Sequence, residues 1–113
     1  MSDNCLFCKI IKGDIPSTRV YEDDDCLVIP DINPIAPRHY LLLPKTHYAT
    51  LADMTAAEAA TLARCLQKIP TLTETLGLTD GYRLVINQGK NAGQTVFHLH
   101  VHILAGRALT WNA

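Results

Sequence analysis

The strongest periodic pattern in the chain is a stripe of apolar residues at spacings of three and four. It consists of Leu62, Leu66, Ile69, Leu72 and Leu76. Because this spacing places side chains on one face of a helix, the stripe predicts a long amphipathic helix. Thr55 and Glu58 form a capping-box pattern at its start, and Gly77 is a natural end. Pro70 should kink or divide the helix, since proline lacks the backbone N–H donor.

Shorter apolar runs on both sides of this helix predict a short helix and several strands. The short helix is expected over residues 6–12, where Gly13 ends it. The expected strands cover residues 19–22, 26–29, 39–44, 81–87 and 97–104. The acidic turn 23–25 should join the first two strands as a hairpin, and the two prolines in residues 31–37 predict an extended loop. This order of elements indicates an α+β domain with an antiparallel sheet.

Length and charge narrow the class of protein. The 113 residues fit one domain over residues 1–113, because a typical domain holds roughly 100–150 residues. The net charge of −1 provides no basic field for a nucleic-acid backbone, and no apolar run is long enough to cross a membrane. Charged residues, among them Asp3 and Lys9, interrupt the stretch that a signal peptide would need. We therefore expect a cytoplasmic protein that binds neither nucleic acid nor membrane.

The cysteines indicate a metal site rather than disulfides. There are four of them, and without an export signal they should stay reduced. Cys5 and Cys8 form a Cys-x-x-Cys pattern, which in a reducing compartment is typical of half a metal site or of a redox pair. The redox interpretation expects a preceding strand, and none is predicted before the pair, so metal binding is favoured. We expect Cys26 and Cys65 to be buried apolar residues.

His98, His100 and His102 are the most informative residues for chemistry. They alternate with the aliphatic residues of the last predicted strand, so that all three imidazoles should share one face of the sheet. Packing alone rarely selects three adjacent imidazoles, because they repel when protonated and lose hydration when buried. Two chemical interpretations remain open at this point: a zinc site on the strand, or a nucleophilic imidazole flanked by helper groups.

The segment before the histidines favours the nucleophile. Residues 87–95 supply glycines, side-chain amides and the hydroxyl of Thr95. Glycines let backbone N–H groups approach an anionic oxygen, and a hydroxyl can donate to one directly. An imidazole that attacks phosphorus needs such a cradle for the other phosphate oxygens.

His98-Leu-His-Val-His102-Ile-Leu resembles the His-φ-His-φ-His-φ-φ signature of the histidine triad (HIT) superfamily, in which φ is hydrophobic. The other segments that resemble its Hint branch, the purine nucleoside phosphoramidases, are residues 7–16, 31–39, 43–47, 93–98 and 105–107, followed by Trp111. The resemblance implies a HIT-like α+β fold whose five-stranded antiparallel sheet carries one long and one short helix. It also implies a homodimer in which the sheet continues across the interface, formed by residues 81–87 and the long helix. Trp111 should reach a neighbouring chain.

The resemblance assigns roles to the residues of the predicted active site. His100 would be the nucleophile, His102 would hold the phosphate oxygens, and His39 would be an accessory histidine behind the triad. Thr95 stands where the family usually has serine and keeps the hydroxyl donor.

The resemblance also implies a binding site for a purine nucleotide such as AMP or GMP. Asp31 would bind the ribose hydroxyls, and Asn87 would lie near the phosphate. Gly93, Gln94 and Thr95 would line the leaving-group side. The apolar walls around the base would include Leu6, Phe7, Ile10, Ile29 and Leu41.

Members of the superfamily that carry an N-terminal Cys-x-x-Cys can bind zinc, and this implies the ligand set Cys5, Cys8, His47 and His98. Two thiolates and two imidazoles complete a tetrahedral shell, so the zinc would be structural. The chemistry at His100 would require no metal.

These residues together predict hydrolysis of purine nucleoside 5′-phosphoramidates, or of aminoacyl-adenylate-like substrates, through a nucleotidyl-His100 intermediate. The same histidine could instead serve a dinucleoside polyphosphate hydrolase or a nucleotidyl transferase. A nucleotide-binding regulatory module without catalysis is a second alternative. A catalytic zinc on the three strand histidines is a third.

Overall fold

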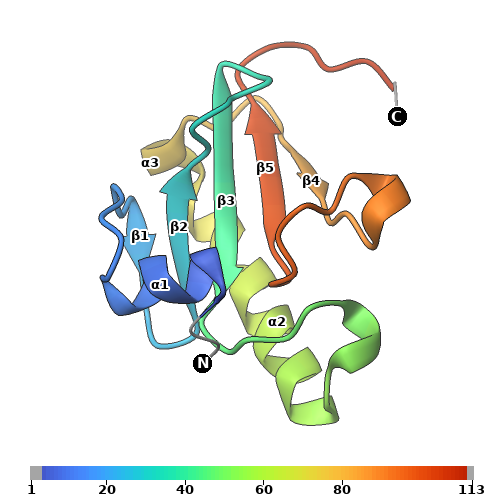
Figure 1. The fold of residues 1–113 in the computed structure, drawn as a ribbon. Coiled ribbons are helices and arrows are strands. Elements are labelled where there is room, and N and C mark those ends of the chain that lie inside the picture. The colour runs from blue at the N-terminus through green and yellow to red at the C-terminus, as the bar shows by residue number, and fades with distance from the viewer. Residues whose placement is uncertain (1–3, 112–113) are drawn as a thin grey trace.

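The protein, described here by a computed structural model over residues 4–111, folds around one antiparallel sheet of five strands in the order β1-β2-β3-β5-β4. The strands are β1 (Tyr21–Glu22), β2 (Cys26–Pro30), β3 (Arg38–Pro44), β4 (Arg83–Val85) and β5 (Val101–Ala105). β3 is the centre of the sheet, where it pairs with β2 on one side and β5 on the other (Figure 1). The predicted hairpin is confirmed by the pairing of β1 with β2.

The helices form where the capping signals and the apolar stripe predict them. They are α1 (Leu6–Lys12), α2 (Ala56–Lys68) and α3 (Thr73–Leu76), with 3-10 turns at Leu51–Asp53, Ile69–Leu72 and Lys90–Ala92. The Thr55 side chain accepts from the Glu58 backbone N–H at 3.2 Å, and the Glu58 side chain accepts from the Thr55 N–H at 2.9 Å. Pro70 lies in the 3-10 turn that separates α2 from α3, as its missing donor predicts. Within residues 4–111, no helix has the length and apolar character needed to span a bilayer.

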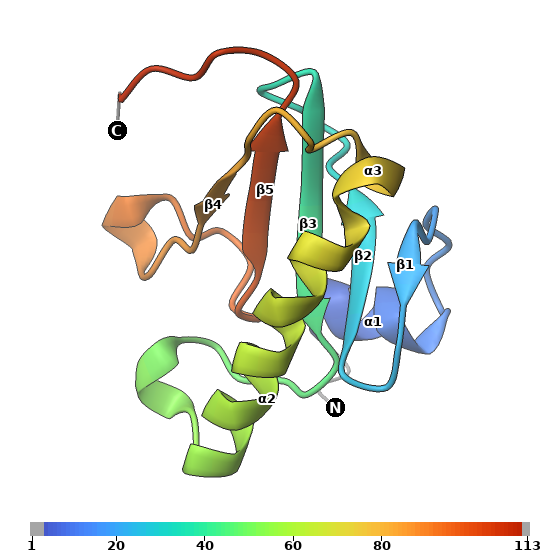
Figure 2. The same cartoon turned by 180° about the vertical axis from the view of Figure 1, so that it is seen from behind.

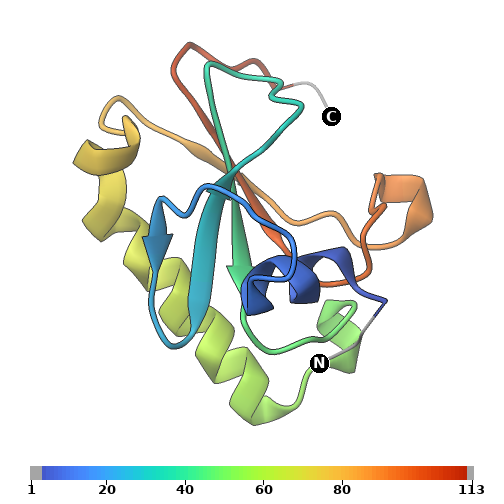
Figure 3. The ribbon, with the colours of Figure 1, turned by 60° about the vertical axis from the view of Figure 1, so that its left-hand side comes forward.

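The two faces of the sheet are covered by different helices. Figures 1 and 2 show α1 on one face and α2 with α3 on the other, and Figure 3 shows the sheet between them. On the α2 face, Leu62, Ile69 and Leu76 pack against Val28, Leu42, Val101 and Ile103 of the sheet. On the α1 face, Phe7, Cys8 and Ile10 pack against Leu27, Ile29, Leu41 and Leu43. The cluster under α2, which we call the α2 core, is the larger of the two. The smaller cluster lies on the face that carries α1.

The register of β3 with β5 determines which residues share each face. Leu41 lies opposite His102, and Leu42 lies opposite Val101. Because directly opposed residues point to the same face, His102 lies on the α1 face with Leu41, while Val101 faces the α2 core.

Some predicted strand limits are wrong. β5 begins at Val101 and not at residue 97, so His98 and His100 precede it, and β4 is limited to residues 83–85 of the predicted 81–87. β3 ends at Pro44, which has no N–H to continue the ladder, and its carbonyl oxygen is bound by the His98 side chain at 2.7 Å. The alternation of the histidines nevertheless persists into this irregular stretch, since Leu99 is fully buried in the α2 core.

Candidate functional site

Four side chains from three parts of the chain meet at the N-terminal end of α1. Cys5 caps α1 and Cys8 lies in its first turn, His47 follows β3, and His98 precedes β5. Their ligand atoms all lie within 4.8 Å of one another. The Cys8 N–H donates to Cys5 Sγ at 3.3 Å, a bond that favours a thiolate. The structure thus brings together all four of the predicted metal ligands.

The spacing of these atoms fits a tetrahedral zinc ion. Zinc bonds of about 2.0–2.3 Å at tetrahedral angles separate two nitrogens by about 3.3 Å and a nitrogen from a sulfur by about 3.6 Å. The two Nδ1 atoms of His47 and His98 are 3.1 Å apart. Cys8 Sγ lies 3.3 Å from His47 Nδ1 and 3.6 Å from His98 Nδ1, and Cys5 Sγ lies 3.5 Å from His98 Nδ1. The cluster could therefore hold a metal ion.

The hydrogen bond that His98 makes through Nε2 leaves its Nδ1 available as a ligand. Nε2 lies 2.7 Å from the carbonyl oxygen of Pro44, which can only accept, so Nε2 carries the proton. Burial, helped by the neighbouring His47 and His100, lowers the pKa of His98 to about 4, although the hydrogen bond to Pro44 acts in the opposite direction. The ring is therefore neutral at pH 7, with its Nδ1 lone pair directed at the two sulfurs.

His100 presents the opposite ring nitrogen. Its Nδ1 lies 2.8 Å from the carbonyl oxygen of His98 and must donate to it. In the neutral ring, the lone pair is then on Nε2. Phe7 packs edge-on against the ring with a centroid distance of 4.9 Å and fixes its orientation. His100 thus has the tautomer that an imidazole nucleophile requires.

His102 and His39 lie beside His100 on the same face. The ring centroids of His100 and His102 are 5.1 Å apart, and His39 Nε2 lies 2.9 Å from His102 Nδ1. Asp31 Oδ2 lies 3.3 Å from the same His39 nitrogen. Burial lowers the pKa of both histidines; for His102 the positive charges of His100 and His39 add to the effect, and in both cases Asp31 opposes it.

The three strand histidines do not converge on one centre. Of the two clusters of ligating atoms in residues 4–111, His98 belongs to the cysteine cluster and His102 to the cluster with Asp31 and His39. His100 belongs to neither. This arrangement argues against a catalytic zinc held by all three.

The loop before the histidines is held by the Gln94 side chain. Its Oε1 accepts from the Gly89 N–H at 2.8 Å and its Nε2 donates to the Ala49 carbonyl at 2.8 Å. The amide of Gln94 is thus engaged with backbone. Of the other side chains predicted to bind here, Thr95 is exposed and Asn87 is half-buried. Gly93 adopts a left-handed φ of 93° beside the Asn87 amide, a conformation that favours glycine.

The predicted apolar walls divide into buried and accessible residues. Four of the five are buried where α1 packs on the sheet: Phe7 and Ile10 of α1, and Ile29 and Leu41 of the sheet. The fifth, Leu6, is exposed. Leu6 lines a hollow of about 390 Å³ together with Asn4, Cys5, His47, Thr95, Val96 and Phe97.

Two residues that the sequence pattern did not single out also flank the site. Ile32 and Ile35, in the loop after Asp31, are 92% and 68% exposed. Apolar side chains next to a predicted ribose carboxylate are a signal that could have identified them.

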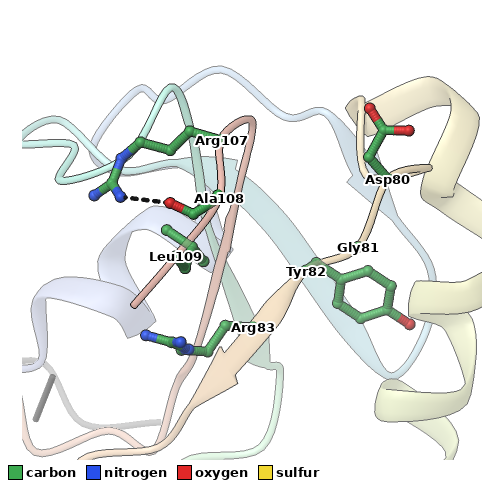
Figure 4. Close-up of a pocket in the computed structure, with 7 residues that line it drawn as sticks. All are labelled: Asp80, Gly81, Tyr82, Arg83, Arg107, Ala108 and Leu109. Carbon is green, nitrogen blue, oxygen red and sulfur yellow. Dashed lines mark hydrogen bonds between the residues drawn. The ribbon is translucent and has the colours of Figure 1, made fainter. Parts of the chain in front are cut away.

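A second hollow, of about 240 Å³, lies between the segment that leads into β4 and the segment that follows β5 (Figure 4). It is lined by Asp80, Gly81, Tyr82, Arg83, Arg107, Ala108 and Leu109, none of which is a predicted site residue. Trp111 lies close by, with its ring centroid 5.9 Å from the Arg83 guanidinium carbon, and is 93% exposed.

Comparison with known proteins shows which family the chain belongs to. Residues 12–109 match the HIT domain family, and the chain belongs to that family. Protein HitA of Neisseria gonorrhoeae is 47% identical over 102 residues, which is 90% of this chain and 95% of HitA. A HIT family hydrolase from Legionella pneumophila has the same fold with a TM-score of 0.90 and 47% identity, covering 96% of this chain and 97% of that one.

Two further relatives carry informative descriptions. Adenylylsulfatase HINT3 of Arabidopsis thaliana is 40% identical over 107 residues, or 92% of this chain and 53% of that protein. A histidine triad protein from Mycobacterium smegmatis, solved in a zinc-bound form, has a TM-score of 0.79 and 43% identity over 92% of this chain and 76% of its own.

Proposed function

We propose that this protein hydrolyses purine nucleoside 5′-phosphoramidates, or adenylates with a related leaving group, to a nucleoside monophosphate. The observation that carries the proposal is the tautomer of His100, whose Nδ1 is bound to the His98 carbonyl oxygen at 2.8 Å. That bond places the lone pair on Nε2, beside His102, on the face of the sheet that α2 does not cover. The names of two relatives, a HIT family hydrolase and an adenylylsulfatase, support hydrolysis at an adenylyl group.

The reaction would proceed in two displacements at phosphorus. His100 Nε2 attacks phosphorus, the P–N bond of the phosphoramidate breaks, and the amine leaves with a proton supplied by water. Water then attacks the nucleotidyl-imidazole, the bond between phosphorus and Nε2 breaks, and the attacking water returns a proton to solvent, replacing the one that the amine took. The ring leaves in its starting neutral form. Imidazole suits both steps, because it is nucleophilic when neutral near pH 7 and is a good leaving group when protonated.

The surrounding residues would bind the nucleotide. Asp31 can accept from both ribose hydroxyls, since a carboxylate has two acceptor oxygens. His102 and the Thr95 hydroxyl would donate to the phosphate oxygens, and the Leu6 side would contact the base. The ligands are therefore expected to be purine mononucleotides such as AMP and GMP.

The decisive measurement compares phosphoramidate turnover by wild type and His100→Ala. We expect the substitution to lower kcat by more than roughly 10³-fold, because loss of the nucleophile removes both displacements. Gln67→Ala is the matched control, since Gln67 is exposed on α2 and should leave the rate unchanged. Acid quenching of wild type should trap a nucleotidyl adduct that is absent from His100→Ala. Equal rates in wild type and His100→Ala would refute the mechanism.

Competition among leaving groups tests the substrate class. Adenosine phosphoramidate, adenylyl sulfate and diadenosine polyphosphates place different leaving groups on one adenylyl phosphorus. We expect the phosphoramidate to be consumed first from an equimolar mixture. Preferential consumption of a diadenosine polyphosphate would favour the alternative hydrolase.

We also propose that Cys5, Cys8, His47 and His98 hold a structural zinc ion. The tetrahedral spacing and the tautomer of His98 support this, as does the zinc-bound relative. Bound zinc would supply cross-linking between α1, the end of β3 and the segment that presents His100. In that state His98 is a ligand and takes no part in proton transfer.

The double variant Cys5→Ser/Cys8→Ser tests the metal proposal. We expect zinc content to fall from about one per chain to near zero and the melting temperature to drop clearly, because a structural metal contributes folding free energy directly. Cys26→Ser/Cys65→Ser is the control for general loss of thiols, since those cysteines are buried away from the cluster. Wild type with well under one zinc per chain, and an unchanged melting temperature in Cys5→Ser/Cys8→Ser, would contradict the proposal.

The active form is proposed to be a homodimer joined at β4. β4 is the last strand in the sheet order, and among the strands of residues 4–111 it pairs with β5 alone. A free strand edge offers unpaired backbone donors and acceptors, which a second copy can satisfy.

A further inference from the structure

His39 has a defined proton position. Its Nδ1 accepts from the Ile35 backbone N–H at 3.1 Å, which requires a lone pair on that nitrogen. The side chain is only 3% exposed, and burial favours its neutral form. In the neutral ring, the single proton must then be on Nε2.

That one proton faces two acceptors. His39 Nε2 lies 2.9 Å from His102 Nδ1 and 3.3 Å from Asp31 Oδ2. The other oxygen of Asp31 accepts from the Asn33 N–H at 2.8 Å, which holds the carboxylate in place. Since a carboxylate is the stronger acceptor, Asp31 competes with His102 for the proton of His39.

The same bonds disfavour a metal at this cluster. Coordination by His39 Nε2 would move the ring proton to Nδ1, where it would face the donating N–H of Ile35. The cluster is therefore better suited to hydrogen bonding than to a cation.

We propose that Asp31, His39 and His102 form a hydrogen-bond relay that couples recognition of the ribose to the orientation of the phosphate-binding imidazole. The proposal rests on the proposed function, in which Asp31 binds the ribose hydroxyls. Hydroxyls bound to Asp31 occupy its acceptor oxygens, and the His39 Nε2–H then donates fully to His102 Nδ1. This bond holds His102 in the tautomer with its proton on Nε2, where it is available to the phosphate. No covalent bond changes in this step, and His39 acts as a positioning residue.

The relay predicts that the ribose contributes to kcat and not only to KM. In wild type, we expect a 2′,3′-dideoxy phosphoramidate to have a kcat on the order of tenfold below that of the ribose substrate, the value of about one hydrogen bond. In His39→Leu, kcat should be low and equal for the two substrates, while the difference in KM persists because Asp31 is intact. His39→Gln should recover part of the kcat lost in His39→Leu, since its amide can donate to His102. An equal fold-loss of kcat on ribose removal in wild type and His39→Leu would overturn the relay.

A measurement without turnover separates this proposal from the hydrolase proposal. Histidine ¹⁵N spectra report which ring nitrogen is protonated, and His102→Asn identifies the His102 signals. Saturating adenosine should shift His102 Nδ1 toward a more strongly hydrogen-bonded value in wild type, whereas 2′,3′-dideoxyadenosine should not, and neither nucleoside should produce this shift in His39→Leu. Identical shifts with the two nucleosides, or no response to adenosine, would overturn the relay whether or not phosphoramidates are hydrolysed. The expected shift in a protein without turnover would retain the relay and refute only the hydrolase.

Discussion

At the scale of single residues, the backbone determines which nitrogen each histidine presents. The carbonyl oxygens of Pro44 and His98 bind Nε2 of His98 and Nδ1 of His100. These two neighbouring imidazoles therefore expose opposite nitrogens, one toward the cysteines and the other toward the open face. Two residues of spacing thus separate the proposed metal ligand from the proposed nucleophile.

The choice of residue types was predictable from the sequence, but the proton positions were not. The alternation of His98, His100 and His102 with aliphatic residues is enough to indicate a shared face. The bond from the Ile35 N–H to His39 joins groups four residues apart across a proline-containing loop, and no periodic pattern encodes it. Likewise, the family resemblance implied that Gln94 lines the leaving-group side of the site, while the structure engages its amide with Gly89 and Ala49.

The lowered pKa values of His39 and His102 predict an acid-sensitive fold. Histidines in an unfolded chain have a pKa near 6.5. Just below that pH, the two histidines therefore bind protons in the unfolded chain but remain neutral in the folded protein. The free energy of unfolding should therefore fall as the pH falls below 6.5 and should be insensitive to these groups above it.

Urea unfolding at pH 7.5 and 5.5 measures the effect, with His39→Gln as the comparison. The variant lacks one histidine with a lowered pKa, so its free energy of unfolding should fall less than that of wild type. The difference should be at most about 1.4 kcal/mol per pH unit. Any zinc contribution is common to both proteins and cancels in the difference. Identical pH dependence in the two proteins would contradict the prediction.

At the scale of elements, the sequence predicts which segments form helices and strands but not where the sheet stops. The α2 capping box and the break at Pro70 depend on neighbours within four residues and are confirmed. The start of β5 depends on Pro44, a residue 57 positions earlier that ends the partner strand, as the pairing of Leu42 with Val101 shows. Such long-range limits follow from pairing and not from local periodicity.

Gly106 follows β5 and lies against Pro37 and Arg38 at the end of the proline loop, so its replacement should be costly. It has a left-handed φ of 98°, and an added Cβ would lie 2.8 Å from Pro37 Cβ and 3.2 Å from the Arg38 backbone nitrogen. Gly13→Ala is the matched control, because Gly13 has a similar φ of 89° with open space around it.

We expect Gly13→Ala to lower the free energy of unfolding by about 1 kcal/mol through backbone strain alone. Gly106→Ala should lose about 1–3 kcal/mol more, because neither proline nor backbone can move away easily. Urea unfolding of the two variants gives the comparison. Equal losses would show that the loop over β5 yields to the added methyl group.

At the scale of the whole molecule, the sheet separates stability from chemistry. One face buries the α2 core, and the other carries both histidine clusters with α1. The order of motifs along the chain predicted this fold, and the HIT family match over residues 12–109 confirms it. The residues alone left open a zinc ion held by all three histidines of the signature, and the structure places His98 and His102 in separate clusters.

The free edge of β4 exposes an apolar side chain. Leu84 lies opposite Ile103 and therefore on the α2 face, but α2 does not cover it, and it is 40% exposed. An apolar residue beside an unpaired strand edge is typical of an interface between chains. Arg83, which belongs to β4 and lines the hollow at the start of that strand, would then lie near the second copy (Figure 4).

We therefore expect wild type to sediment at micromolar concentration with twice the 12.5 kDa mass of the chain. Leu84→Glu should raise the dimer dissociation constant by at least about tenfold, since it places a charge in an apolar contact next to the strand edge. Leu51→Glu is the control, because Leu51 is 48% exposed in a 3-10 turn that is not part of the sheet and should not change the mass. A 12.5 kDa wild type would contradict the dimer, and a dimer unaffected by Leu84→Glu would move the interface to another surface. If the dimer also completes the site, phosphoramidate turnover of Leu84→Glu should rise with protein concentration as the chains reassociate, whereas that of Leu51→Glu should remain constant per chain.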